Sequence, residues 1–410
     1  MQPIEILHLA YTYFPADTRV KREVEALQAT GRRLAVIALR GPNERPIERW
    51  NGVTIVRVPG RKSRGGVGSY VGEYGAFVLR CRRLVARHAA FSHVRIVHVH
   101  TLPDFLLWAA LPAHDRGARL VFDMHEIFPE FVRSKFPGTL GRPIAALAQR
   151  IEQWARDRAD LTITVNQPIQ QLLVSRPIGR PEHRIVLHNT ADPADFGNPA
   201  APSHGSPPSS VDLIYHGTLT FLYGLDVAIR GIGVARKHGL NAHLTILGDG
   251  PERSALRRLA AQLGLEDHVS FEVPIRQCDL PARLRRCVAG VVPTRLDGMT
   301  RYSLSTKLLE YVHLGIPVLA ARLPSYERYL SNDTLWYWTA GDPEDLARVI
   351  REFAGTSAAE RARRAQLARD AIGPLAWTLE RRQLLDAYGR LLASDSDRIH
   401  AIRSAALPSP

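Results

Sequence analysis

Short runs of apolar, often β-branched residues alternate along the chain with longer stretches in which apolar residues recur every three or four positions. The first short run, residues 4–9, predicts a strand. In the stretch that follows, Val20, Val24 and Leu27 share one helical face, and Asp17 is placed to cap the start of the helix. Strand and helix alternating in this way are typical of parallel sheets built from βαβ units.

The alternation continues in two blocks. In the first block we expect further strands at residues 34–39, 53–58, 95–100, 120–123, 161–165 and 185–187. A stretch rich in Pro, Ala, Gly and Ser then lacks any periodicity, which indicates a linker. In the second block we expect strands at residues 211–215, 243–247, 269–272, 290–293 and 317–320.

These blocks predict an α/β protein of two Rossmann-like domains with a cleft at the carboxyl ends of both sheets, where open α/β sheets bind ligands. We expect a first domain at residues 1–195, a linker at 196–210, a second domain at 211–374, a helix at 375–392 and a flexible tail at 393–410.

Composition excludes several classes of protein. The 410 residues are 45% apolar and 23% charged, which excludes wholesale disorder. The longest apolar runs are far shorter than the roughly 20 residues needed to cross a bilayer, and the first residues lack the basic start of a signal peptide. The three cysteines lack metal-ligand spacing and fit a reducing compartment. We therefore expect a cytoplasmic protein, soluble or peripheral at the cytoplasmic face of the membrane.

Charge is the skewed quantity. Lys and Arg total 54 against 40 for Asp and Glu, a formal net charge of +14, which favours anionic partners such as nucleotide phosphates or an anionic membrane surface. Genome composition explains the arginine content equally well. Nucleic acid is disfavoured because aromatic residues make up only 7%. The basic, amphipathic stretch at residues 61–87 predicts either a helix on an anionic membrane or a solvated helix packed on its own sheet.

Common cofactor motifs are missing from the sequence. No Gly-x-Gly-x-x-Gly follows a predicted strand and no Walker loop occurs, which disfavours NAD chemistry and ATP hydrolysis. His93, His98, His100 and His125 lie close in sequence but have no carboxylate at matching spacing. We therefore expect no metal site.

The strongest candidate for chemistry lies at residues 302–320. Ser305 or Thr306 is placed to cap a helix running to about residue 314, whose N-terminus is a ready site for an anion. Lys307 and Glu310 are three residues apart and share one face of it. The pair fits a phosphate and the hydroxyls of a ribose, or an ordinary ion pair on a solvated face, and spacing leaves both interpretations open.

Several segments, each weak alone, form an ordered set. They are FPADTRVKRE at 14–23, VHT at 99–101, DMHE at 123–126 with PE at 129–130, HNTAD at 188–192, HGTL at 216–219, LGDGP at 247–251 and the block at 303–320, together with Trp377. With them the chain resembles the retaining glycosyltransferases of the GT-B fold in family four.

The resemblance implies two facing Rossmann-like domains and a C-terminal helix that crosses back to the first. It also implies transfer of a sugar from a nucleotide-diphosphate sugar to an acceptor hydroxyl, with retention of anomeric configuration and without metal or cofactor. A UDP- or GDP-sugar is the expected co-substrate. The acceptor, whether a sugar, a lipid-linked group or a small molecule, stays open, as does the pathway: glycan, glycolipid or natural-product biosynthesis.

By the same resemblance, His125, Lys307 and Glu310 are catalytic. The donor-binding set is Gly217, Thr218, Arg295, Arg301, Ser303, Ser305, Thr306, Lys307 and Glu310, and the acceptor-side set is Asp17, Arg19, Asp123, His125 and Glu126. Glu310 would hold the ribose, and amides near Gly217 and Ser305 the diphosphate. His125 would face the donor sugar and acceptor. The alternative is that His125 is a loop histidine whose hydrogen bonds are all made within the fold.

Three positions depart from the family pattern. Tyr302, Thr218 and Tyr223 stand where the family often carries a carboxylate and two cations, and Lys307 is the obvious substitute cation. These departures leave an alternative function open, that of a catalytically silent GT-B subunit which binds only nucleotide or protein.

Overall fold

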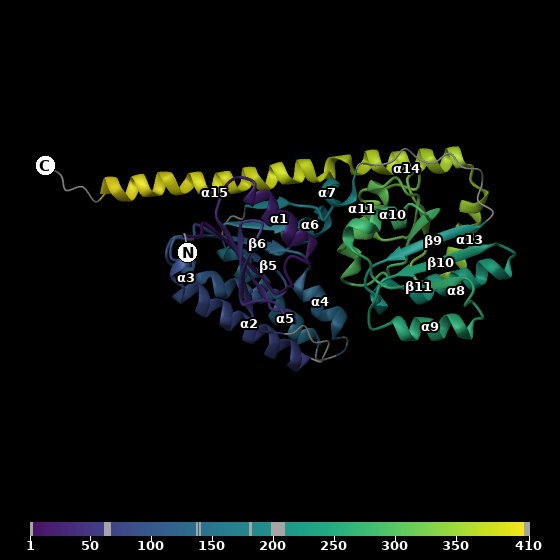
Figure 1. Cartoon of the computed structure of the whole chain (residues 1–410), viewed down its shortest axis with the longest axis horizontal. Coiled ribbons are helices and arrows are strands. Elements are labelled where there is room, and N and C mark those ends of the chain that lie inside the picture. The colour runs from purple at the N-terminus through teal and green to yellow at the C-terminus, as the bar shows by residue number, and fades with distance from the viewer. Residues whose placement is uncertain are drawn as a thin grey trace. The chain divides into compact units, whose positions relative to one another are not determined.

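The computed structural model describes residues 3–60, 67–136, 138, 141–179, 183–197 and 210–405, without the side chains of 67–71 and 394–405. Contacts divide the chain into two units. The first unit is Met1–His188 with Thr378–Pro410, and the second is Asn189–Trp377. The chain thus consists of two α/β units, each built on a mainly parallel sheet (Figure 1).

The first unit is built on an eight-stranded sheet with strand order β3-β4-β2-β1-β5-β6-β7-β8. Its strands are β1 (Ile6–Ala10), β2 (Leu34–Leu39), β3 (Ile47–Trp50), β4 (Val53–Val58), β5 (Ile96–His100), β6 (Arg119–Met124), β7 (Leu161–Thr164) and β8 (Arg184–Val186). All are parallel except β3, which pairs antiparallel with β4. The central strands β1, β2, β4 and β5 are buried along their whole length, as both faces of the sheet are covered.

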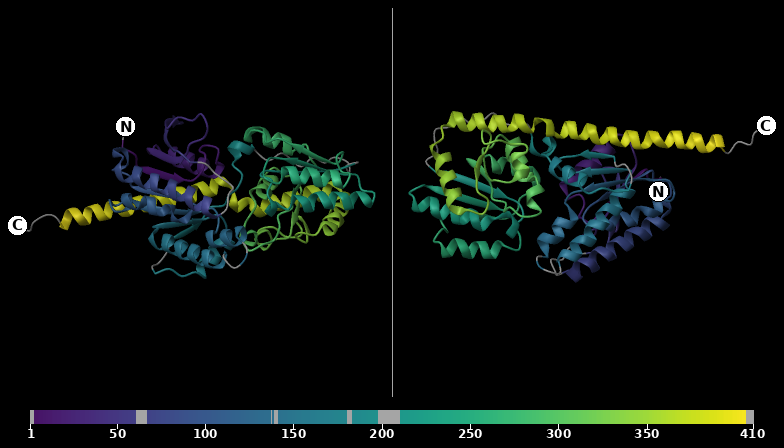
Figure 2. Two further views of the ribbon diagram at one scale, coloured as in Figure 1. Left: turned by 90° about the horizontal axis from the view of Figure 1, so that it is seen from below. Right: turned by 180° about the vertical axis from the view of Figure 1, so that it is seen from behind.

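Helices cover both faces of this sheet. They are α1 (Thr18–Gln28), α2 (Val67–Arg87), α3 (Leu111–His114), α4 (Phe128–Lys135), α5 (Gly141–Arg158) and α6 (Gln167–Val174), with short turns η1 (Ala89–Phe91) and η2 (Asp104–Ala110). α2 and α5 lie on one side of the sheet, and α1 lies on the other (Figure 1 and Figure 2). Asp17 caps α1, as predicted, by accepting a hydrogen bond from the backbone N–H of Val20 at 3.2 Å.

The second unit is built on a six-stranded sheet with strand order β11-β10-β9-β12-β13-β14. Its strands, parallel throughout, are β9 (Val211–His216), β10 (Ala242–Leu247), β11 (Val269–Glu272), β12 (Ala289–Val292), β13 (Val318–Ala321) and β14 (Trp336–Trp338).

Its helices are α7 (Pro193–Phe196), α8 (Leu225–Lys237), α9 (Arg253–Gln262), α10 (Leu280–Leu284), α11 (Thr306–His313), α12 (Pro324–Glu327), α13 (Pro343–Gly355) and α14 (Ala358–Ile372), with turns η3 (Phe221–Tyr223), η4 (Gln277–Asp279), η5 (Thr300–Tyr302) and η6 (Gly373–Leu375). α8 and α9 lie on one side of the sheet, and α11 and α14 on the other (Figure 1).

The last helix, α15 (Trp377–Ala405), returns to the first unit as the family resemblance implied. Its Glu380 accepts a 3.0 Å hydrogen bond from the backbone N–H of His188 and contacts the His188 ring at 2.7 Å. The helix does not end at residue 392, as predicted, but continues to Ala405. Residues 393–405 contain no Pro or Gly, the two residues that most disfavour a helix interior, so the sequence allows the helix to continue.

The boundary between the blocks also differs from the prediction. Residues 189–195, which we placed in the first domain, belong to the second unit, and Ala191 and Phe196 pack in its hydrophobic core. Most of the predicted linker, residues 198–209, lies outside the described residues. Within the described part of the chain, no helix combines the length and apolar character that crossing a membrane requires.

Tight packing across β12 fixes one side chain of the second unit. A Cβ on Gly290 would lie 2.4 Å from the ring of Tyr311, which is fully buried and is bonded through its hydroxyl to the backbone oxygen of Ile214 at 2.9 Å. The ring therefore rests directly on the strand, and only glycine leaves room for it.

We expect Gly290→Ala to lower the free energy of unfolding of the second unit by about 1–3 kcal/mol, because a backbone-facing methyl group overpacks the Tyr311 site. Urea unfolding followed by tryptophan fluorescence measures it. Gly233→Ala in α8 is the matched control: its Cβ would meet Leu265 at an ordinary 3.4 Å, and alanine favours the helix. Equal losses in both variants would contradict the packing argument.

Candidate active site

Strand order marks one position in each sheet where ligands are expected. In the first sheet β1 lies between β2 and β5, and in the second β9 lies between β10 and β12, so the direction of strand succession reverses there. Open α/β sheets bind ligands outside the carboxyl ends of the strands at such a reversal. Predicted site residues follow or end these strands in both units.

In the first unit, strand register gathers polar side chains on one face of three neighbouring strands. His8 of β1 is paired with His98 of β5, and His100 is paired with Asp123 of β6. The rings of His98 and His100 stack with centroids 4.2 Å apart, and His8 Nδ1 lies 3.0 Å from His100 Nε2. All four side chains are buried. Each therefore needs a polar partner inside the fold.

Arg19 of α1 supplies the charge that this cluster needs. Its guanidinium donates two hydrogen bonds to the Asp123 carboxylate, at 2.7 and 3.0 Å, and a third to the backbone oxygen of Leu187 at 2.8 Å. Glu23, one helical turn further along α1, lies 3.1 Å from the same guanidinium. Two in-line hydrogen bonds give this buried pair both strength and a fixed geometry.

These contacts set the protonation of the cluster. Burial alone would raise the pKa of Asp123, but Arg19, His125 and His100 hold it well below its usual range. Burial and the neighbouring histidines lower the pKa of His100 to about 3, despite its bond to Asp123. Burial raises the pKa of Glu23. The cluster is therefore held around one ionised carboxylate, Asp123, with neutral imidazoles at His8 and His100, whose pKa values burial lowers.

His125 is the member of this cluster that reaches solvent. Its side chain is 20% exposed, and its Nε2 lies 2.9 Å from Asp123 Oδ2 and 3.2 Å from His100 Nδ1. Burial opposes the charged imidazole, but Asp123 outweighs it and raises the pKa of His125. Of the other predicted acceptor-side residues, Asp17 caps α1 beside it and Glu126 follows it in the chain, with a pKa that burial raises.

The C-terminal helix takes part in the same cluster. The Tyr388 hydroxyl of α15 lies 2.7 Å from His98 Nδ1, and both side chains are fully buried. Sequence reasoning missed Tyr388, Glu23 and His8. The one available signal was the i,i+4 spacing of Arg19 and Glu23.

The argument against a metal at these histidines needs correction. Carboxylates do come within reach of them, from α1 and β6: ligand atoms of Glu23, His98, His100 and Asp123 all lie within 4.8 Å of one another. The residue types would suit zinc. A cation at this place would have to displace Arg19, which already contacts both carboxylates.

In the second unit, the side chain of Lys307 lies over the turn that follows β9. A Cβ on Gly217, whose φ is +120°, would lie 2.4 Å from Lys307 Cε, so glycine is required for this approach. The Lys307 ammonium lies 4.2 Å from the centroid of the Tyr223 ring and 5.5 Å from that of Tyr215. The cation–π contacts hold a positive charge at the β9 carboxyl end.

Glu310 and Lys307 do not form the alternative i,i+3 ion pair. Glu310 Oε2 instead lies 2.5 Å from Nε2 of His216, the last residue of β9. The Glu310 side chain remains 17% exposed. α11 therefore presents its cation and its carboxylate toward the turn after β9 from one side of the helix.

The other predicted donor-binding residues lie around the same turn and the start of α11. Thr218 is exposed, and its backbone oxygen accepts a 2.8 Å hydrogen bond from Tyr215. Ser305 is the N-cap of α11 and makes no side-chain capping bond, Thr306 begins the helix, and Ser303 donates to Met299 at 3.3 Å.

The two predicted arginines differ in what they contact. Arg295 follows β12, pairs with Asp226 at 2.5 Å and covers the Phe221 ring at 4.4 Å. Arg301 is exposed and lies 5.9 Å from the ring of its neighbour Tyr302. Arg295 thus flanks the strand reversal in a fixed position, whereas the position of Arg301 rests on one long contact.

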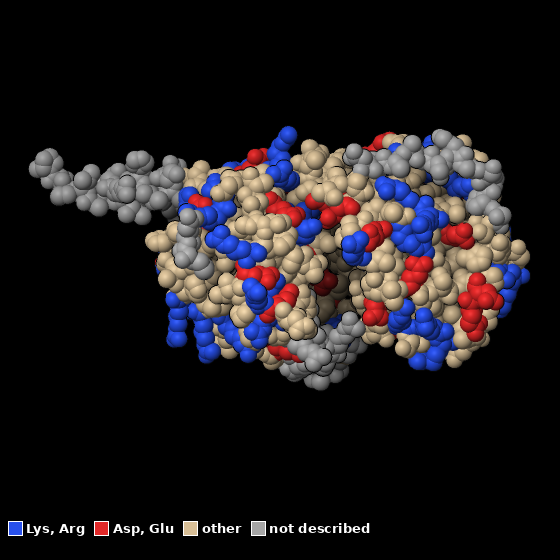
Figure 3. Space-filling view, in the orientation of Figure 1, with Lys and Arg blue, Asp and Glu red and all other residues tan. Residues whose placement is uncertain are grey.

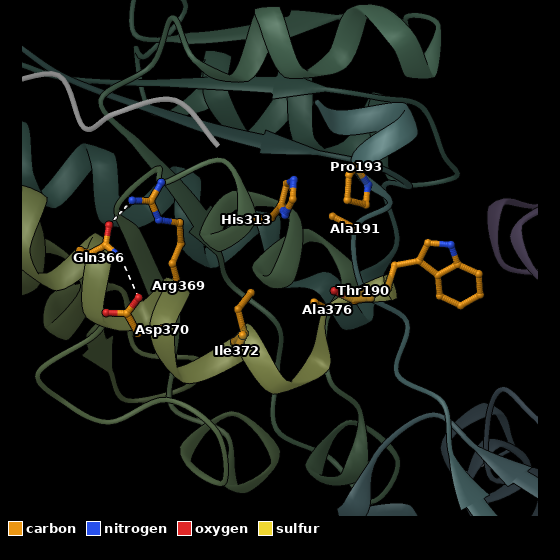
Figure 4. Close-up of a pocket in the computed structure, with 11 residues that line it drawn as sticks. Thr190, Ala191, Pro193, His313, Gln366, Arg369, Asp370, Ile372 and Ala376 are labelled. Atoms are coloured by element: carbon orange, nitrogen blue, oxygen red, sulfur yellow. Dashed lines mark hydrogen bonds between the residues drawn. The ribbon is translucent and has the colours of Figure 1, made fainter. Parts of the chain in front are cut away.

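A separate pocket of about 450 Å³ lies among α7, the end of α11 and α14 (Figure 4). His313 donates to the backbone oxygen of Gly197 at 2.9 Å, and Gln366 bonds to Arg369 and Asp370. None of the predicted site residues lines it.

Family comparisons match both units. A model described as Glycosyltransferase Family 4 matches residues 16–195, and one described as Glycosyl transferases group 1 matches residues 210–355.

Among curated proteins, the GDP-mannose-dependent alpha-(1-6)-phosphatidylinositol monomannoside mannosyltransferase of Mycolicibacterium smegmatis is 34% identical over 101 residues, 24% of this chain and 26% of that protein's length. The D-inositol 3-phosphate glycosyltransferase 2 of Catenulispora acidiphila is 27% identical over 296 residues, covering 68% of this chain and 66% of its own.

Solved structures share the fold at low identity. Sucrose-phosphate synthase from Thermosynechococcus elongatus has a TM-score of 0.76 at 16% identity, covering 96% of this chain and 100% of that one. HepE (Alr3699) from Anabaena, solved in complex with UDP and glucose, has a TM-score of 0.69 at 16% identity, covering 94% of this chain and 99% of its own.

We expect Asp123→Asn to lower the free energy of unfolding of the first unit by about 3–5 kcal/mol, because Arg19 then stays buried without the carboxylate that accepts two of its hydrogen bonds. Folding lowers the pKa of Asp123, so the stability from this carboxylate is present above about pH 4 and is lost as the pH falls toward the folded value. The difference between wild type and variant should therefore shrink in acid. Urea unfolding across the pH range measures both effects.

The double variant Arg19→Met with Asp123→Asn tests the cause. Removing the cation as well should recover part of the loss, since the guanidinium is no longer buried without Asp123 and Glu23, whose pKa burial raises, can take up a proton. Strictly additive losses would contradict a charge-pair origin.

Proposed function

The chain belongs to the GT-B glycosyltransferases of family 4, and from this membership we propose that it transfers a sugar from a nucleotide-diphosphate sugar to an acceptor hydroxyl. The single observation that carries the proposal is that Lys307 and Glu310 both lie at the turn after β9. One side of α11 offers a cation for a diphosphate and a carboxylate for a ribose beside the strand reversal of the second sheet.

A UDP- or GDP-sugar is the donor that we propose. Among the structural neighbours, HepE is described in complex with UDP-glucose, and one curated relative is described as GDP-mannose-dependent. The backbone N–H groups that open α11 add to Lys307 on the side of the leaving diphosphate. Positive charge from these protein groups suits a reaction that needs no metal.

We propose that transfer retains the anomeric configuration. The bond from the anomeric carbon to the diphosphate oxygen breaks, the acceptor oxygen bonds to the same face of that carbon, and the acceptor proton passes to the departing phosphate. No enzyme nucleophile is needed. The protein orients both substrates and stabilises the charge that develops on the leaving group.

We assign the acceptor side to His125 and its neighbours in the first unit. His125 combines exposure with a raised pKa and a fixed bond to Asp123, which favours its charged form and lets the ring donate a hydrogen bond to the acceptor. Asp17 and Glu126 flank it as further polar groups. Anomeric analysis of the product by NMR, with and without a chelator, tests retention and metal independence together.

The expected result of Lys307→Ala is a fall in turnover of about 10²–10³, because one charge stabiliser of the leaving diphosphate is lost. The assay screens UDP-, GDP-, ADP- and TDP-sugars by thermal shift and then measures donor hydrolysis and transfer. Lys307→Arg should recover part of the rate. Lys237→Ala, an exposed lysine at the end of α8, is the control and should leave the rate unchanged.

Two results would count against this proposal. A wild-type rate in Lys307→Ala would move the phosphate contact to an arginine such as Arg295. Nucleotide binding without turnover on any acceptor would instead favour the catalytically silent subunit.

An anionic membrane is a partner that we propose through α2. The helix buries Phe77, Val78, Cys81 and Val85 against the first unit, and its outer side carries the arginines 80, 83 and 87 beside Leu79, which is 46% exposed. Basic side chains project from the edge of the first unit over α2 (Figure 3). Residues 61–66 of the predicted basic stretch lie outside the described residues.

Replacing Arg80, Arg83 and Arg87 together by Gln should weaken binding to phosphatidylglycerol vesicles more than tenfold, since each arginine near an anionic surface contributes about 1 kcal/mol. Co-sedimentation measures the binding. A variant with Gln at Arg230, Arg258 and Arg286, exposed arginines of the second unit, matches the charge change. Equal weakening in both variants would point to net charge rather than to α2.

A further inference from the structure

His216 occupies a position between two residues of α11. Its Nε2 lies 2.5 Å from Glu310 Oε2, and its Nδ1 lies 2.9 Å from the hydroxyl oxygen of Tyr311. The side chain is only 8% exposed. The imidazole therefore links the buried tyrosine to the carboxylate that faces solvent.

The bonding pattern fixes where the imidazole carries a proton. Glu310 offers only acceptor atoms when ionised, so a 2.5 Å contact requires a proton on His216 Nε2. In the neutral imidazole, Nδ1 accepts a hydrogen bond from the Tyr311 hydroxyl. In the charged imidazolium, Nδ1 donates a hydrogen bond to the tyrosine oxygen, and Tyr311 donates to the backbone oxygen of Ile214. Under both arrangements His216 donates to Glu310.

Close packing on the sheet holds Tyr311, the buried end of this hydrogen-bonded chain, in place. The Tyr311 ring rests on Gly290 of β12 so closely that a Cβ there would lie within 2.4 Å of it. The rings of His216 and Tyr311 meet edge to face with centroids 5.0 Å apart. Packing on the sheet thus fixes Tyr311, and the Tyr311 hydroxyl and ring position His216. His216 in turn fixes one carboxylate oxygen of Glu310 through a hydrogen bond.

We propose that His216 is the positioning residue for Glu310, and that the pair makes the site selective for ribonucleotide over 2′-deoxyribonucleotide donors. The inference rests on the proposed function and adds to it a residue that acts through the carboxylate expected to hold the ribose. A carboxylate has about four lone-pair sites, so Oε2 accepts from His216 and still accepts a hydroxyl, while Oε1 accepts the second. A 2′-deoxyribose supplies only one of the two hydroxyls and leaves part of the fixed carboxylate unpaired.

The test compares matched pairs of nucleotides by calorimetry: UDP with 2′-deoxy-UDP, and GDP with 2′-deoxy-GDP. The wild-type protein should bind the ribonucleotide of its preferred pair roughly tenfold or more tightly, the worth of a hydrogen bond to a charged group. In His216→Ala this ratio should fall close to one, as in Glu310→Ala. His216→Gln keeps a side-chain N–H donor and should recover part of the ratio.

Two controls separate positioning from folding. His243→Ala removes a part-exposed histidine from the opposite end of the neighbouring strand β10 and should leave the ratio unchanged. The double variant of His216→Ala and Glu310→Ala should match Glu310→Ala alone, because the histidine acts through the carboxylate.

The outcomes also separate this inference from the proposed function. If the wild type binds a nucleoside diphosphate with a ratio near one, or if His216→Ala keeps the wild-type ratio while Glu310→Ala loses it, the positioning role is overturned and the transferase proposal stands. If the wild type binds none of the four nucleotides, the proposed function fails and the inference fails with it.

Discussion

Parallel alignment of neighbouring strands is the constraint on which both candidate sites depend. Parallel strands end at the same edge of a sheet, so residues from distant parts of the sequence arrive side by side there. In the first unit this alignment pairs His8 with His98 and His100 with Asp123. In the second it brings the turn after β9 beside the end of β12. The register of the strands therefore brings these polar residues together even when they are far apart in the sequence.

The cluster in the first unit places a charged carboxylate inside the fold, where it is destabilising unless it is paired. This explains why side chains from so many elements contact Asp123. An unpaired Asp123 would destabilise the fold by several kcal/mol. Arg19 from α1 pairs with it, His125 and His100 bond to it, and Tyr388 from α15 bonds to the stacked His98. The C-terminal helix is therefore joined to the first unit by a specific polar contact as well as by apolar packing. Its return to this unit follows from the same need to satisfy buried polar groups.

The sequence was sufficient for most of the fold, because long apolar runs and helical periodicity state the βαβ order directly. It failed at β3 and β14. β3 is an edge strand of four residues, half of them apolar and none of them buried, and β14 is three aromatic residues long, so both are too short for a period to show. For the sites, motif positions located Arg19, Asp123, His125, Lys307 and Glu310. Tyr388 escaped because its partner His98 lies 290 positions away, and the contact is fixed only by helix packing. Glu23 escaped because its i,i+4 spacing from Arg19 does not show that both side chains are buried beside His98. The metal argument failed for the same reason, since it counted ligands by sequence spacing.

The departures of the second unit from its family pattern are understandable as one connected change. Tyr223 stands where a cation is usual, yet its ring is what the Lys307 ammonium lies against, so the charge is kept and only its source has moved to α11. Gly217 leaves the room for that approach. Lys307 lies against the tyrosines, and the side chain in contact with Glu310 is His216. Of the three departures, the one at Tyr223 is thus matched by a contact that places a cation at the turn after β9.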